Sequence, residues 1–144
     1  MGKKIKVVFD TNVWISIFME KRLRDEFSMV KQNLTVYVSE DIALEISKVL
    51  QYPQVTEVIM KIGISKKEVL RILSVNSKKV EPKLKLHVIN EDADDNKILE
   101  CALAARADLI VSGDKHLLEL GKFKKTRIMT PRDFFDNVKG NYKS

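Results

Sequence analysis

Two aspartates follow short apolar segments that have the composition of buried β-strands. Asp10 comes directly after segment 5–9, and Asp114 comes after segment 109–113. The carboxyl ends of the strands in an open α/β sheet form the ligand crevice, so we expect both carboxylates to point into the same place. Carboxylates that converge there repel one another unless a cation lies between them. Sites with oxygen ligands alone suit Mg²⁺ or Mn²⁺.

A third acid, Glu45, lies in a segment with helical periodicity. At 100° per residue it falls between Ile42 and Val49, at the edge of the apolar stripe, which holds it near the sheet. The alternative is a boundary glutamate that reaches water.

The fourth acid comes from the acidic stretch 92–95. Asp92 is suited to be a helix N-cap. Asp95 lies on the apolar face that is expected to cover the sheet, whereas Asp94 points about 100° away, towards solvent. Asn96 is the polar alternate if the helix begins one residue later. The sequence therefore predicts a Mg²⁺ or Mn²⁺ site for phosphate chemistry, with Asp10, Glu45, Asp95 and Asp114 as metal ligands and catalytic residues.

Other polar residues have supporting roles in this prediction. Asp92 is expected to cap the helix or to support the metal ligands without touching the metal itself. Asn12 is placed to cap the first helix, which leaves Asp10 available, and Ser112 is placed to orient a carboxylate or a water. The alternative is that Asp10 and Asp114 are themselves ordinary helix caps. The two histidines, His87 and His116, have no second His or Cys nearby, so a zinc site has little support.

Alternating strand and helix signals predict an α/β fold with a parallel sheet. We expect a single domain over residues 1–144. Strands are predicted at about 5–9, 34–38, 86–89, 108–112 and 127–129. Helices are predicted around 13–18, 23–30, 39–50, as a pair within 54–80, and at 92–105, 115–120 and from 131.

Bulk properties limit the class of protein. The net charge of +6 and the pI of about 9.4 favour an acidic partner such as nucleic acid, and the alternative is a lysine-rich solubilising surface. Charged residues interrupt every apolar run before it reaches the length of a membrane span. We expect no signal peptide, and the single cysteine, Cys101, excludes an intrachain disulfide. These features favour a cytoplasmic protein.

Five ordered motifs lie at 8–13, 42–46, 92–102, 107–114 and 130–134. Together they resemble the PIN-domain family, and most closely its toxin-like (VapC-type) subgroup. The resemblance implies a Rossmann-like three-layer fold with a five-stranded parallel sheet in the order 3-2-1-4-5, and frequent homodimers. It implies a Mg²⁺- or Mn²⁺-dependent endoribonuclease, with RNA as substrate and an antitoxin as protein partner. The family's acids correspond to Asp10, Glu45, Asp95 and Asp114, and its small hydroxyl residue to Ser112.

Three other functions are compatible with the sequence. The first is an RNA-processing or decay nuclease without an antitoxin. The second is a non-catalytic module that binds a partner through apolar residues of segment 54–80, although burial in the core is the more common fate of such residues. The third is a phosphotransferase with an aspartyl nucleophile, which requires a second aspartate where Asn12 stands. No glycine-rich phosphate loop follows the first strand, which argues against nucleotide binding.

Overall fold

A six-stranded sheet forms the centre of the molecule in a computed structural model that describes residues 3–90 and 93–143, with side chains to 138. The strand order is β3-β2-β1-β4-β6-β5, and every neighbouring pair is parallel except β5 and β6. The five parallel strands follow the predicted order 3-2-1-4-5, but the sheet is not the predicted five-stranded parallel one, because the antiparallel β5 adds a sixth strand at its edge. The strands are β1 (Ile5–Phe9), β2 (Leu34–Val38), β3 (Lys78–Lys79), β4 (Leu109–Val111), β5 (Lys122–Phe123) and β6 (Thr126–Met129).

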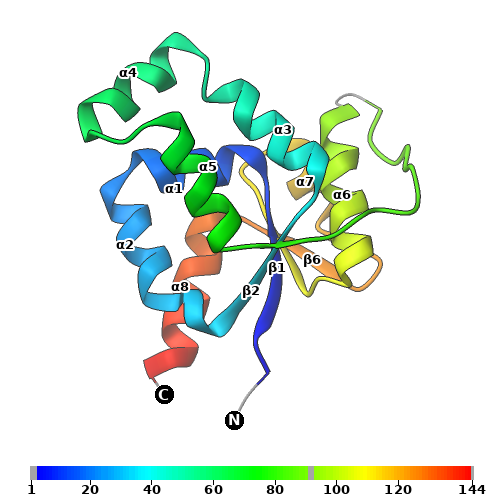
Figure 1. Cartoon of the computed structure of the whole chain (residues 1–144). Coiled ribbons are helices and arrows are strands. Elements are labelled where there is room, and N and C mark those ends of the chain that lie inside the picture. Colours follow the sequence, from blue (N-terminus) through cyan, green and yellow to red (C-terminus); the bar gives the residue numbers. More distant parts are fainter. Residues whose placement is uncertain (1–2, 91–92, 144) are drawn as a thin grey trace.

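Helices cover both faces of this sheet, which gives three layers (Figure 1). α6 packs on one face, and α1, α2 and α8 lie on the other. None of the helices within the described ranges is long and apolar enough to cross a membrane. The helices are α1 (Thr11–Met19), α2 (Lys21–Val30), α3 (Glu40–Val49), α4 (Pro53–Ile62), α5 (Lys66–Val75), α6 (Ala93–Ala105), α7 (Lys115–Leu120) and α8 (Pro131–Lys143), with a 3-10 turn, η1 (Lys31–Asn33), before β2.

Several helix ends follow the sequence signals. Ser39 and Ser65 cap α3 and α5, because their hydroxyls accept hydrogen bonds from the amides of Ile42 and Glu68. Gly63 ends α4 in a left-handed conformation with φ of 89°, which glycine adopts without strain. Pro131 begins α8 at a position where its missing N–H costs nothing.

The prediction of a strand at 86–89 is wrong. The parallel neighbour of β2 is instead the two-residue β3 at 78–79. Three backbone donors of this segment bind side chains of α6: Leu86 N donates to Glu100 Oε2, and the amides of Val88 and Ile89 both donate to Asn96 Oδ1. Side chains of α6 therefore hold this segment, and no strand ladder forms.

The central strand β1 is buried on both faces. Val7, Val8 and Phe9 are fully buried, as expected for a strand in the middle of a covered parallel sheet. The Phe9 ring makes edge contacts with Trp14 and Phe134, at centroid distances of 5.2 and 5.7 Å. This packing fixes the strand, and therefore the position of the residue that follows it.

The apolar stripes of α4 and α5 are used mainly for the core. Val55, Ile59, Val69 and Leu73 are buried, so core packing is confirmed for these four residues over the alternative of a docking surface. Cys101 is also fully buried, and burial raises the pKa of its thiol to about 12, which makes it an inert core residue.

Candidate active site

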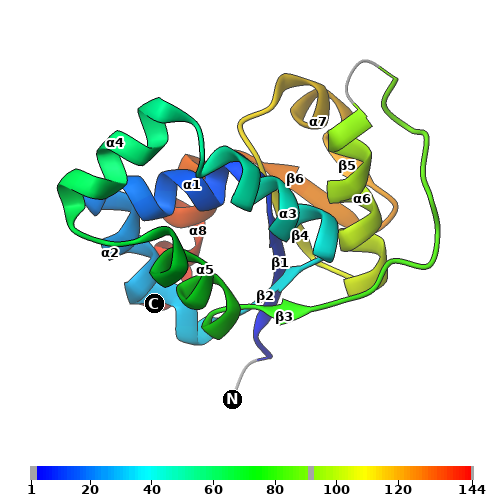
Figure 2. The same ribbon diagram turned by 45° about the horizontal axis from the view of Figure 1, so that its top comes forward.

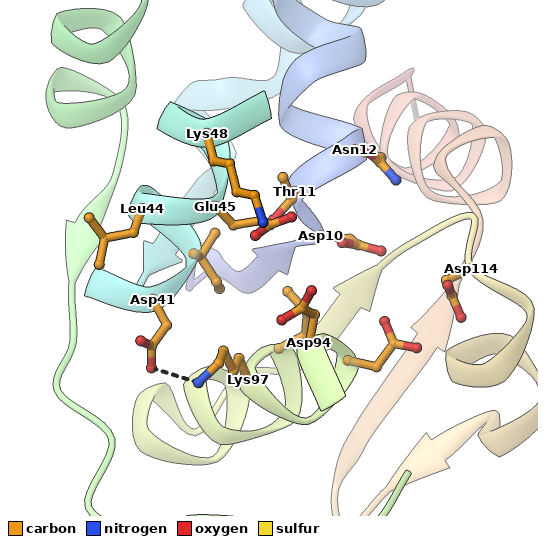
Figure 3. A pocket seen from close by; sticks show the side chains of 13 residues that line it. Asp10, Thr11, Asn12, Asp41, Leu44, Glu45, Lys48, Asp94, Lys97 and Asp114 are labelled. Carbon is orange, nitrogen blue, oxygen red and sulfur yellow. Dashed lines mark ion pairs between the residues drawn. The ribbon is translucent and has the colours of Figure 1, made fainter. Parts of the chain in front are cut away.

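A pocket of about 310 Å³ lies beyond the carboxyl ends of β1 and β4 (Figure 3). Its walls come from the start of α1, from α3, from α6 and from the turn before α7. The acids and lysines among its lining residues are Asp10, Asp41, Glu45, Lys48, Asp94, Asp95, Lys97 and Asp114. The structure thus brings all four predicted acids to one pocket from four different elements.

Asp10 is placed by the sheet itself. Its amide donates to Val111 O at 3.0 Å, so the pairing of β1 with β4 continues to this residue. The side chain is only 8% exposed. It belongs to none of the ion pairs in the described ranges (3–90 and 93–143). The buried carboxylate therefore has no cationic partner within those ranges.

Ser112 orients the Asp10 carboxylate. The fully buried Ser112 hydroxyl donates to Asp10 Oδ2 at 2.6 Å, and it accepts from the amide of Asp114 at 3.0 Å. One hydroxyl therefore links the Asp10 carboxylate to the backbone of Asp114. This geometry is the one expected of an orienting residue, and the role of Ser112 in the site stays a prediction.

The ionisation of Asp10 is unfavourable in this environment. Burial raises the pKa of its carboxyl above the ordinary value, and the nearby Asp114 carboxylate raises it further. Hydrogen bonding from Ser112 and from the amides of Thr11 and Asn12 lowers the pKa and offsets part of the burial effect. A cation in the pocket would favour the ionised form.

Asp114 serves as the N-cap of α7, as in the alternative weighed from the sequence. Its Oδ1 accepts a hydrogen bond from His116 N at 2.8 Å. The cap engages one of two carboxylate oxygens, so capping and a place in the pocket are compatible.

The helical acids lie as their periodicity predicts. Glu45 is half-buried on α3. On α6, Asp95 is only 4% exposed and Asp94 is exposed, although both line the pocket. Burial therefore favours Asp95 as the third acid, and its role as a ligand stays a prediction.

The other predicted supporting residues are placed differently. Asn12 is not the N-cap of α1, because the helix begins at Thr11 and Asp10 takes the cap position, with no side-chain bond of capping geometry. Asn12 is exposed and lines the pocket. Asn96 is outside the pocket lining and binds the 88–89 segment. Asp92 lies outside the described residues.

The sequence did not indicate three charged residues of the lining. Asp41 lies one helical turn before Glu45, and its Oδ2 pairs with Lys97 Nζ at 3.6 Å across the space between α3 and α6. Lys48 lies on the same helix as Glu45. The i, i+4 spacing of Asp41 and Glu45 was a signal that could have found the first of them.

The donor chemistry of the pocket fits a hard divalent cation. The acidic side chains of the lining offer only oxygen atoms as metal ligands, and the buried Asp10 carboxylate has the Asp114 carboxylate close by. Within the described ranges, however, no three Asp, Glu, His or Cys side chains stand together as a ready-made metal group. Binding would therefore have to draw the carboxylates closer, because without a cation they repel one another.

Comparisons with known proteins agree with this architecture. A family model described as PIN domain matches residues 6–116. An uncharacterized protein of Methanocaldococcus jannaschii is 28% identical over 149 aligned residues, which cover 92% of this chain and 91% of that protein. A chain in the crystal structure of VapBC2 from Rickettsia felis, bound to a DNA fragment from its promoter, superposes with a TM-score of 0.60 and 12% identity. That superposition covers 88% of this chain and 98% of the other, and it shows a shared fold.

The family match covers β1 from its second residue, the helices α3 and α6 that carry the helical acids, and both Ser112 and Asp114. Members of this family are generally nucleases. The chain belongs to the PIN domain family.

Proposed function

We propose that the chain is a divalent-metal-dependent endoribonuclease that hydrolyses phosphodiester bonds of RNA in the pocket between α3 and α6. The observation that carries the proposal is the buried Asp10 carboxylate, which lies at a strand end, without a cationic partner in the described ranges, in a pocket lined by five more acids. Burial of a carboxylate without a cationic partner costs folding free energy, and groups perturbed in this way cluster at functional sites.

In this proposal Asp10, Glu45, Asp95 and Asp114 hold Mg²⁺ or Mn²⁺. The bound cation supplies an activated water and stabilisation of charge on the phosphate oxygens. Ser112 fixes the orientation of Asp10 through its 2.6 Å hydrogen bond. Lys48 and Lys97 line the same pocket and offer positive charge to the substrate backbone.

The experiment that tests the proposal is cleavage of a panel of labelled single-stranded and structured RNAs. We expect cleavage with Mn²⁺ or Mg²⁺ and none in the presence of EDTA, because the acids alone supply no Lewis acid. Internal fragments identify an endonuclease. Cleavage that persists in EDTA, or no cleavage of any RNA with either metal, would refute the proposal.

We further propose that this nuclease is the toxin of a toxin–antitoxin pair, that it forms homodimers and that it acts in the cytoplasm. The fold shared with a chain of the VapBC2 complex supports the first part. An RNA-processing nuclease without an antitoxin is the second candidate. Expression in cells separates them: growth arrest that needs Asp10 indicates a toxin, and unimpaired growth indicates a processing role.

A further inference from the structure

A second groove runs along β2, from Lys4 before the start of β1 to Lys78, which is in register with Val8 through Tyr37. It has a volume of about 580 Å³. Three lysines from separate elements line it: Lys4 before β1, Lys31 in η1 and Lys78 in β3. Figure 2 shows β3 directly after the end of α5, beside β2. We call this feature, defined by Lys4, Lys31 and Lys78, the lysine groove.

The charge of the lysine groove is the reverse of that of the active-site pocket. No acid is among its lining residues, whereas six acids and two lysines line the pocket. All three lysines are exposed, and they take part in none of the ion pairs in the part of the chain that the structure describes. The positive excess of the chain therefore lies outside the pocket, and this groove concentrates part of it.

Two helices end at the lysine groove, which offers a simpler explanation for the lysines. The carboxyl ends of α2 and α5 each have about half a negative charge, and lysines near them are stabilising. The three full positive charges of the lysines nevertheless exceed the two half negative charges of the helix ends. Two carbonyls of α5 are also already satisfied, because Asn76 Nδ2 donates to Ile72 O and Ser77 Oγ donates to Leu73 O. The groove keeps a net positive charge.

The shape of the groove favours a long anion over a compact one. Small phosphates bind where several N–H donors converge, as in a nest or at a helix amino end. Here the lysines come from three elements along an open groove, and the apolar side chain of Val75, which is 69% exposed, lines it beside them. Spaced cations next to an apolar wall suit the phosphates and the sugars or bases of a single strand.

We propose that the lysine groove binds the RNA backbone outside the active site and thereby extends the substrate surface. This inference rests on RNA as the substrate in the proposed function. The five residues of β1 separate Lys4 from Asp10, and five strand residues span about 17 Å. Only an RNA of several nucleotides can reach from the pocket to the Lys4 end of the groove, so the whole groove discriminates by length and a short substrate does not use it.

The test compares two triple variants that remove the same charge. One is Lys4→Ala, Lys31→Ala and Lys78→Ala; the control is Lys67→Ala, Lys122→Ala and Lys125→Ala, at exposed lysines outside the groove. Binding of a labelled 20-nucleotide RNA is measured by anisotropy in EDTA over a range of salt concentrations. We expect the groove variant to raise Kd about tenfold more than the control does and to lower the salt slope by about 2.

A cleavage assay separates this inference from the proposed function. With Mn²⁺, the groove variant is expected to cleave a trinucleotide at the wild-type rate and the 20-nucleotide RNA with a raised KM. Equal weakening by both triple variants, or no weakening by the groove variant, overturns the inference while leaving the nuclease intact. If neither RNA is cleaved by the wild type but the binding difference is present, the groove stands and the nuclease proposal fails.

Discussion

Asp10→Asn is expected to lower metal-dependent RNA cleavage by about 10³-fold, which corresponds to about 4 kcal/mol of the activation barrier. The amide keeps the shape of the side chain and can still accept the Ser112 hydrogen bond, but it removes the charge at the centre of the pocket. The loss therefore reports on the carboxylate, and not on the fold. Initial rates with Mn²⁺ measure it.

The same variant is expected to be more stable than the wild type at pH 7 without metal. The folded-state pKa of Asp10 is raised above the ordinary value of 3.8, so its ionisation costs stability. This cost is absent below 3.8, where the group is protonated in both states, and it develops as the pH rises through the folded-state pKa. Melting curves in EDTA should show a higher Tm for Asp10→Asn at pH 7, and a smaller difference towards pH 4.

Asp25→Asn is a matched control, because Asp25 is exposed on α2 and paired with Lys21. It should leave both cleavage and the pH dependence unchanged. A variant at Asp10 that retains wild-type turnover would remove Asp10 from the site. A lower Tm in EDTA at pH 7 would show that its charge is compensated in the folded protein.

Asn96→Ala is expected to destabilise the fold by about 3 kcal/mol. The Asn96 side chain is buried; its Oδ1 accepts from the amides of Val88 and Ile89 at 2.9 Å, and its Nδ2 donates to Ile89 O at 2.7 Å. Truncation leaves backbone groups beside the buried Ile89 without partners, which is more costly than the loss of the bonds alone.

Urea unfolding measures this effect. Asn137→Ala is the control, because Asn137 is exposed on α8, and its change should stay within about 0.5 kcal/mol. A loss below about 1 kcal/mol for Asn96→Ala would mean that the 88–89 segment is not held by this side chain.

The strands β1, β2, β4 and β6 and the helical faces of the acids could be predicted from composition and periodicity, whereas β3 and β5 were not predicted. β1 is a short apolar run with β-branched residues, and the inward position of Asp95 follows from its place on the helical face that includes Ile98 and Leu99. Those patterns are local, so the sequence contains them directly. The resemblance to a family added the strand order, which periodicity alone does not determine.

The errors came from contacts between distant segments. Segment 86–89 has the composition of a strand, but its amides bind side chains of α6, and nothing in the segment indicates this. The cap of α1 falls on Asp10 and not on Asn12 because strand pairing extends to Asp10 and the helix begins at the next residue. Asp41 and Lys97 were missed because periodicity gives the face of a helix but not the element opposite it.

The most direct test of the central claim is a calorimetric titration of the metal-free protein with Mn²⁺, alongside Asp10→Asn. We expect saturable binding to the wild type at the acidic pocket, and binding that is weakened at least about tenfold in the variant. No heat of binding to the wild type, or equal affinity in the two proteins, would contradict the assignment of these carboxylates as a metal site.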